Sequence, residues 1–119
     1  MFLITLFLLT LISCERTNTG MTCGVDNPLE NVPWLNNLVD EYESSTSPQE
    51  LVIIRYTYKK GYVFLIDNCP RGCADNLVYV YNCESEVICE IGGIDGRITC
   101  PDFETEASDR TILYNSLDK

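Results

Sequence analysis

Apolar and polar positions recur along the chain with two different periods. From about Pro33 onward, apolar side chains lie three and four residues apart, which predicts an amphipathic helix. They are Leu35, Leu38, Val39 and Tyr42. After residue 50, runs of β-branched and aromatic residues alternate with turn residues and predict strands. These runs are 51–58, 62–67, 77–82, 87–91 and 111–114, with 97–100 as a further short one.

This pattern predicts a small α+β domain, in which one N-terminal amphipathic helix packs on a twisted antiparallel sheet of about five strands. One face of the sheet then carries the core and the other meets water. The sequence KKG, between the first two strands, is typical of a hairpin with a positive φ at Gly61. The sequence GGIDG at 92–96 predicts a tight bend rather than a phosphate loop, because no β-α-β pattern surrounds it.

An uncharged apolar run at residues 1–13 ends immediately before Cys14. It is shorter than the about 20 residues that a transmembrane helix needs, so it is interpreted as an export signal. Its end, LISC, resembles the bacterial lipobox, although no Lys or Arg precedes the run. The resemblance implies cleavage before Cys14 and diacylation of Cys14. The polar sequence that follows predicts a tether over 14–22, and the chain length predicts a single domain over 23–119. The alternative is a buried N-terminal helix or strand with Cys14 in a disulfide.

Lipidation would make the membrane a partner of the chain, because each buried acyl methylene contributes roughly 0.8 kcal/mol. In lipoproteins of enteric bacteria, Asp directly after the lipidated cysteine favours the inner membrane. Glu15 stands at that place and lacks this signal. The expected location is therefore the outer membrane of a bacterial cell envelope.

Composition narrows the classes of partner and of chemistry. The 119 residues include 18 acidic and 8 basic ones, which gives a net charge of −10. Such a surface repels nucleic acid, so no nucleic-acid partner is expected. The chain has no histidine, and so it lacks the usual general base near neutral pH and the commonest metal ligand. We predict neither a cofactor nor a metal site.

The cysteine count complements the lipobox. Seven cysteines are present, and lipidation of Cys14 leaves six: Cys23, Cys69, Cys73, Cys83, Cys89 and Cys100. An even number in an oxidising compartment predicts three disulfides, for which 15 connectivities exist. A local link between Cys83 and Cys89 is geometrically possible, and so is a link from Cys23 to a C-terminal cysteine. The spacings do not include the C-x2-C pairs that zinc sites favour.

Several sequence blocks look distinctive: NPLENVPWL, CPRGCAD, VYNC, VICEIGGIDG and TCPDF, spread through residues 27–103. Together they resemble an uncharacterised family of short bacterial lipoproteins that is known only as a domain of unknown function. The resemblance covers nearly all of the mature chain. It implies a lipid-anchored single domain, and it implies no activity and no catalytic residue.

The sharpest local feature is CPRGC at 69–73, where Arg71 stands between Pro70 and Gly72. A rigid loop that projects one basic side chain can fill a protease pocket, because pre-ordering lowers the entropy cost of binding. One hypothesis is therefore a small disulfide-rich protease inhibitor. The simpler interpretation is a β-turn with a solvated arginine.

Tyrosines on the predicted strands suggest a binding surface. Alternation places Tyr56 and Tyr58 on one face of their strand, and Tyr79 and Tyr81 on one face of theirs. Tyrosine binds proteins and sugars well because its apolar ring has a polar tip. If the helix covers the opposite side, these four side chains form a surface for an envelope protein or glycan; alternatively, they pack beneath the helix. For Trp34, beside the helical stripe, the corresponding alternatives are a core anchor and a ligand-stacking ring.

Carboxylates are numerous in the second half of the chain: Glu84, Glu86, Glu90, Asp95, Asp102, Glu104 and Glu106. A facing pair could act as the acid and base of a small hydrolase. Asp95 and Asp102 with nearby carbonyls could instead bind calcium, although the spacing is not that of an EF-hand. The favoured interpretation is a non-catalytic, lipid-anchored binding or structural module, with inhibitor and hydrolase as alternatives.

Overall fold

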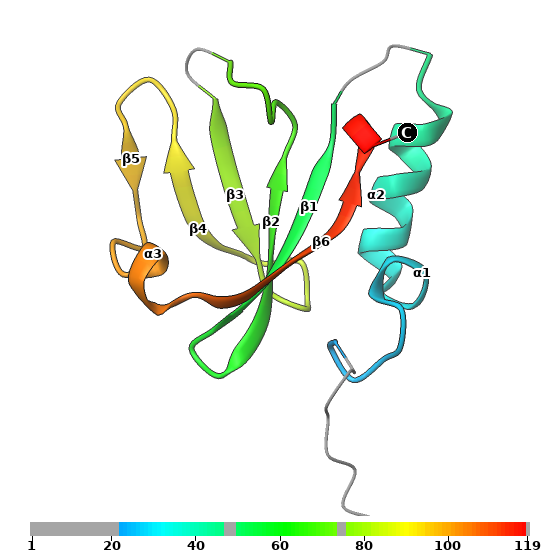
Figure 1. Cartoon of the computed structure of the whole chain (residues 1–119), viewed down its shortest axis with the longest axis horizontal. Coiled ribbons are helices and arrows are strands. Elements are labelled where there is room, and N and C mark those ends of the chain that lie inside the picture. Colours follow the sequence, from blue (N-terminus) through cyan, green and yellow to red (C-terminus); the bar gives the residue numbers. More distant parts are fainter. Residues whose placement is uncertain (1–21, 47–49, 74–75, 119) are drawn as a thin grey trace, which may run out of the picture.

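The computed structural model describes residues 22–46, 50–73 and 76–118. It contains one open antiparallel sheet of six strands in the order β5-β4-β3-β2-β1-β6 (Figure 1). The strands are β1 (Val52–Tyr58), β2 (Gly61–Asp67), β3 (Leu77–Tyr81), β4 (Val87–Gly92), β5 (Arg97–Ile98) and β6 (Ser108–Asn115). The α+β class is confirmed, and the sheet has six strands instead of about five.

Three short helical segments and one longer helix accompany the sheet. They are α1 (Pro28–Asn31), α2 (Pro33–Ser44), α3 (Phe103–Glu106) and the 3-10 turn η1 (Ser116–Asp118). Helix α2 begins at Pro33, whose fixed φ suits the first helical turn, after Val32 in extended conformation. The predicted export signal and Cys14 lie outside the described residues. Within the described part of the chain, no helix has the length and apolarity needed to cross a membrane.

Strands β1 to β5 form a meander, and the β1–β2 hairpin has a two-residue turn. Lys59 and Lys60 have φ values of 48° and 65°, as a type I′ turn requires. The expectation of a positive φ at Gly61 is wrong, because Gly61 is already the first residue of β2 and pairs with Tyr58.

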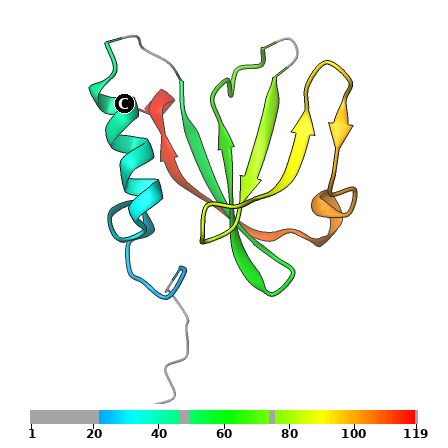
Figure 2. The same cartoon turned by 180° about the vertical axis from the view of Figure 1, so that it is seen from behind.

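From β5 at one edge of the sheet, the chain returns to the opposite edge, where β6 pairs with β1 (Figures 1 and 2). Helix α3 lies on this return path. It places Phe103 against Tyr56 and Tyr58, with 5.2 Å between ring centroids in both pairs. The crossover therefore covers part of the sheet.

Each face of the sheet carries its own hydrophobic core. Strand register assigns the faces, because directly paired residues share a face and adjacent residues on a strand do not. Under α2 the buried residues are Val32, Leu35, Leu51, Ile53, Phe64, Ile66 and Tyr114. Under α3 they are Tyr58, Val63, Val80, Cys89 and Phe103. The expectation that one face meets water is wrong, since the segment around α3 covers much of it.

The six cysteines form three disulfides, which confirms the expected number. The pairs are Cys23–Cys83, Cys69–Cys73 and Cys89–Cys100. A local Cys83–Cys89 link is absent because Cys83 and Cys89 take partners outside the β3–β4 hairpin. Cys89 is fully buried and attaches β4 to the segment that leads into α3. Cys83 holds the segment before α1 against the β3–β4 turn.

Candidate functional site

Helix α2 covers only half of its face of the sheet. It packs over Ile53, Phe64 and Ile66 of the central strands β1 and β2. Figure 2 shows α2 beside β6 and β1, whereas β3, β4 and β5 extend away from it. Among the described elements, no helix covers β3 and β4 on this side. We call this uncovered half the open face.

Aromatic rings lead from the core onto the open face. Phe64 is fully buried, and its ring centroid lies 5.6 Å from that of Trp34. Trp34 lies 5.5 Å from Tyr81, and Tyr81 lies 6.2 Å from Tyr79. In register, Tyr81 pairs with Phe64 and Tyr79 pairs with Ile66, so both tyrosines share the face of α2. Phe64 is buried, and the three rings that follow it are half-buried, so the series carries apolar ring surface from the core to the open face.

The two tyrosines of this series are partly exposed to solvent. Tyr79 and Tyr81 are half-buried, and neither hydroxyl has a hydrogen-bond partner among the described residues. Burial raises the pKa of the Tyr81 hydroxyl, and the nearby Tyr79 raises it further. The Tyr81 hydroxyl therefore remains a neutral donor near neutral pH, available to a ligand.

A groove of about 310 Å³ runs between α2 and the strands β2 and β3. Its apolar lining consists of Trp34, Leu38, Ile66 and Tyr81. Its polar lining consists of Asn37, Glu41 and Asn68. A second hollow of about 230 Å³ shares Leu38, Glu41 and Asn68 with it and continues to Leu51, directly before β1. We call the two together the α2 groove.

The α2 groove is held in place by contacts of high sequence separation. The Trp34 indole Nε1 donates a hydrogen bond of 2.8 Å to the Cys83 carbonyl oxygen. The Cys23–Cys83 disulfide spans a sequence separation of 60 and fixes the same turn. Trp34 therefore serves both interpretations made from the sequence: it anchors the core, and it lines a groove.

The tyrosines of β1 do not belong to this site. Tyr56 pairs with Val63, next to Phe64 on β2, so it faces the opposite side from Tyr81. Tyr58 is buried, and its hydroxyl donates a 2.6 Å hydrogen bond to Asp102 Oδ1. The hydrogen bond to Asp102 raises the pKa of Tyr58 and burial adds to the shift, while the same hydrogen bond lowers the pKa of Asp102. The single surface of four tyrosines expected from the sequence is wrong.

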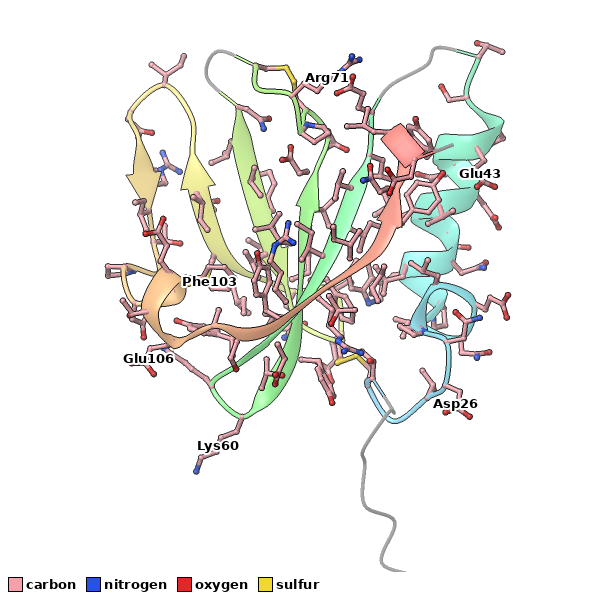
Figure 3. All side chains as sticks on the ribbon, in the orientation of Figure 1. Asp26, Glu43, Lys60, Arg71, Phe103 and Glu106 are labelled. Carbon is pink, nitrogen blue, oxygen red and sulfur yellow. A yellow bond between two sulfur atoms is a disulfide. The ribbon has the colours of Figure 1, made fainter. Side chains whose placement is uncertain are left out.

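Arg71 lies on a tightly turned loop at the end of the sheet opposite Lys60 (Figure 3). The Cys69–Cys73 disulfide closes this loop, and Gly72 N donates to the Cys69 carbonyl at 3.0 Å. The Arg71 side chain is 75% exposed and forms an ion pair with Glu50. The loop therefore presents a basic side chain that already has an acidic partner.

The carboxylates of the β4–β5 region are engaged with Arg97. Glu90 Oε2 lies 2.8 Å and Asp95 Oδ2 lies 3.2 Å from the Arg97 guanidinium. Asp102 instead contacts Tyr58, with Lys59 Nζ at 3.9 Å. Within the described residues, no three Asp, Glu, Cys or His side chains gather in an arrangement that could hold a metal ion.

Sequence reasoning missed the polar lining of the α2 groove. It gave no role to Asn37, Glu41 or Asn68. Asn37 and Glu41 lie four residues apart on the helix, beside Leu38, so one turn-spaced polar pair marks the rim. This polar pair can be recognised as part of a groove only when the strands beside α2 are known.

These features define a small, disulfide-linked α+β domain with a half-covered antiparallel sheet. The chain belongs to the family described as a domain of unknown function, DUF6970, which matches residues 40–116. The match runs from the second half of α2 to the end of β6. No curated protein and no solved structure matches the chain.

Proposed function

We propose that the chain is a lipid-anchored, non-catalytic binding module of the bacterial cell envelope that uses the α2 groove and the open face. The observation that carries the binding role is the aromatic series from Trp34 through Tyr81 to Tyr79 beside a groove with a polar rim. Binding sites of this kind combine apolar surface with a few placed polar groups. The ligand is an envelope protein or a glycan.

The cysteine pairing supports the anchor. All six cysteines after residue 22 are in disulfides, so Cys14 has no cysteine left with which to pair inside the chain. An acyl group on its sulfur accounts for this odd thiol. The LISC sequence supports the same assignment, and Glu15 favours the outer membrane.

The surroundings of the carboxylates favour a non-catalytic role. A hydrolase of the two-carboxylate type needs one carboxyl group whose pKa is raised so that it can donate a proton. Asp102 has its pKa lowered by the Tyr58 hydrogen bond, and Glu90 and Asp95 contact the same guanidinium. The Tyr58 contact thus favours the charged form of Asp102 over a proton donor, and the Arg97 guanidinium occupies Glu90 and Asp95.

A capture experiment tests the binding role. Full-length protein in detergent is immobilised and incubated with envelope extract, alongside the Tyr79→Ala variant and a Lys60→Ala control on the remote hairpin turn. We expect the native chain and the Lys60 variant to retain the same component, and the Tyr79 variant to lose it. Equal retention by all three proteins, or no retention by any, would contradict the proposal.

A second candidate function is protease inhibition through Arg71. The observation in its favour is the 75% exposed arginine on a disulfide-closed turn. A trypsin-like enzyme would have to displace Glu50 from the guanidinium, which weakens this candidate. Inhibition of such an enzyme by the native chain, and its loss in Arg71→Ala, would establish this function; absence of inhibition eliminates it.

A further inference from the structure

The α2 groove carries negative charge, and no cation of the described residues compensates it. Glu41 is the charged side chain that lines it, and Glu41 has no ion pair among the described residues. Helix α2 contains no Lys or Arg, and Asp40 and Glu43 next to Glu41 are exposed. The groove therefore attracts a cationic group and repels an anionic one.

The position of Glu41 on the helix strengthens the field. Glu41 stands in the second half of α2, near the end where the last carbonyl groups carry the negative pole of the helix dipole. An acidic side chain at this end is unfavourable for the helix dipole, so Glu41 gains nothing from it. The Glu41 carboxylate and the dipole act together on whatever occupies the groove.

Basic residues elsewhere in the described chain do not neutralise this charge. Arg71, beyond the groove, pairs with Glu50, and Arg97 pairs with Glu90 on the far strands. Among the residues that the structure describes, the lining of the groove includes neither Lys nor Arg. Glu41 thus remains available to a partner from outside the chain.

The rest of the lining suits a polypeptide. Trp34 and Tyr81 form the aromatic lining of the groove, which we call its floor, and Asn37 on α2 and Asn68 after β2 add amide side chains. Each amide side chain can both donate and accept a hydrogen bond, as an extended peptide backbone requires. The volume of about 310 Å³ lies at the low end of the ~300–1,000 Å³ of ligand pockets, which suits an inserted side chain better than a whole cofactor.

We infer that the α2 groove binds a basic segment of a polypeptide partner, with an apolar side chain on the Trp34–Tyr81 floor and a Lys or Arg against Glu41. The inference rests on the proposed binding function and names the ligand for the same surface. Charge complementarity selects the partner, and the apolar floor supplies the contact area.

A peptide selection with a fluorescence readout tests this inference. Random short peptides displayed on phage are selected on the full-length protein in detergent, and selected sequences free of tryptophan are synthesised. Trp34 is the one tryptophan of the chain and lines the groove, so its emission reports occupancy directly. Affinity is measured for the native chain, for Glu41→Gln and for Glu104→Gln, which removes the same charge from α3 on the other face.

We expect the selected peptides to be rich in Lys or Arg beside an aliphatic or aromatic residue, and to shift Trp34 emission. Glu41→Gln should weaken binding about two- to fivefold, whereas Glu104→Gln should leave it unchanged. Added salt should weaken binding to the native chain more than to Glu41→Gln.

Selected peptides without basic enrichment, or equal weakening by both variants, would overturn the inference. If soluble glycan fragments shift Trp34 emission and the basic peptides do not, the occupant is a sugar; the inference then fails and the binding function stands. If no probe shifts the emission and envelope capture does not depend on Tyr79, both fail.

Discussion

The Cys23–Cys83 and Cys69–Cys73 disulfides close chain loops of very different length. Their sequence separations are 60 and 4 residues. Cross-linking stabilises a fold mainly by restricting the unfolded chain, and the effect grows with the length of the closed loop. We therefore predict that the Cys23→Ser/Cys83→Ser variant is less stable than the Cys69→Ser/Cys73→Ser variant.

The size of the difference follows from the loop lengths. The chain-entropy relation gives about 4 kcal/mol for the Cys23–Cys83 loop and about 2 kcal/mol for the Cys69–Cys73 loop. Domains of this size have total stabilities of about 5–15 kcal/mol. Loss of the Cys23–Cys83 bond thus removes a large share of the stability, while the shorter loop tolerates its loss. The third bond is unsuited to the comparison, because Cys89 is buried and its replacement also changes core packing.

Urea unfolding followed by Trp34 fluorescence measures both variants on one scale, since the free energy of unfolding falls linearly with urea. Trp34 is a suitable probe because its indole contacts the Cys83 carbonyl directly. We expect the two midpoints to differ by the amount that corresponds to about 2 kcal/mol. Equal midpoints, or a lower midpoint for the Cys69/Cys73 variant, would refute the reasoning that the long loop fixes the N-terminal segment.

Two further predictions concern backbone strain and pH. Gly92→Ala should lower the melting temperature more than Gly96→Ala. Both residues have positive φ, which costs an L-residue about 1–2 kcal/mol. A Cβ at Gly92 also collides with the Asn76 carbonyl oxygen, whereas a Cβ at Gly96 has no atom nearby. Equal costs would contradict the close approach at Gly92. Tyr58→Phe should lower the free energy of unfolding at pH values above 3.8, the ordinary pKa of Asp102. The difference in stability from the native chain should shrink as pH falls through the lowered pKa of Asp102 in the folded state, because the protonated carboxyl no longer favours the hydrogen bond. A gap independent of pH in urea midpoints measured on both sides of this window would show that Asp102 is not the partner that matters.

The parts of the fold that follow a local period could be predicted from the sequence. The helical stripe of α2 and the alternating strands β1 to β4 repeat every few residues, and their ends carry turn residues. The number of disulfides followed from the count of cysteines. The pairing did not, because it depends on which chain ends meet in space.

The crossover through α3 has no such local signal. Phe103 is a single aromatic residue in an irregular segment, and its burial against Tyr56 and Tyr58 becomes visible only when β6 is placed beside β1. The placement of the β1 and β3 tyrosines on opposite faces of the sheet also has no local signal, because it depends on strand register. Alternation fixes the face of a side chain within its own strand, whereas the pairing of Phe64 with Tyr81 fixes the relation between strands.

The candidate site was predictable in its chemistry and not in its shape. Tyr79, Tyr81 and Trp34 were recognised as possible ligand contacts, but the groove that joins them to Asn37 and Asn68 forms between segments far apart in the chain. A charged residue on a helix gives no sign in the sequence that the strands β2 and β3 lie beside it. The role of Glu41 therefore follows from the fold and not from the sequence pattern.

The intact mass of the protein extracted from membranes, without reductant, tests the central claim most directly. An anchored and oxidised envelope domain requires a chain that lacks residues 1–13, is heavier by acyl chains on Cys14 and is lighter by the hydrogens lost in three disulfides. A mass that retains residues 1–13 without acylation, or that includes free thiols at the six paired cysteines, would contradict the account.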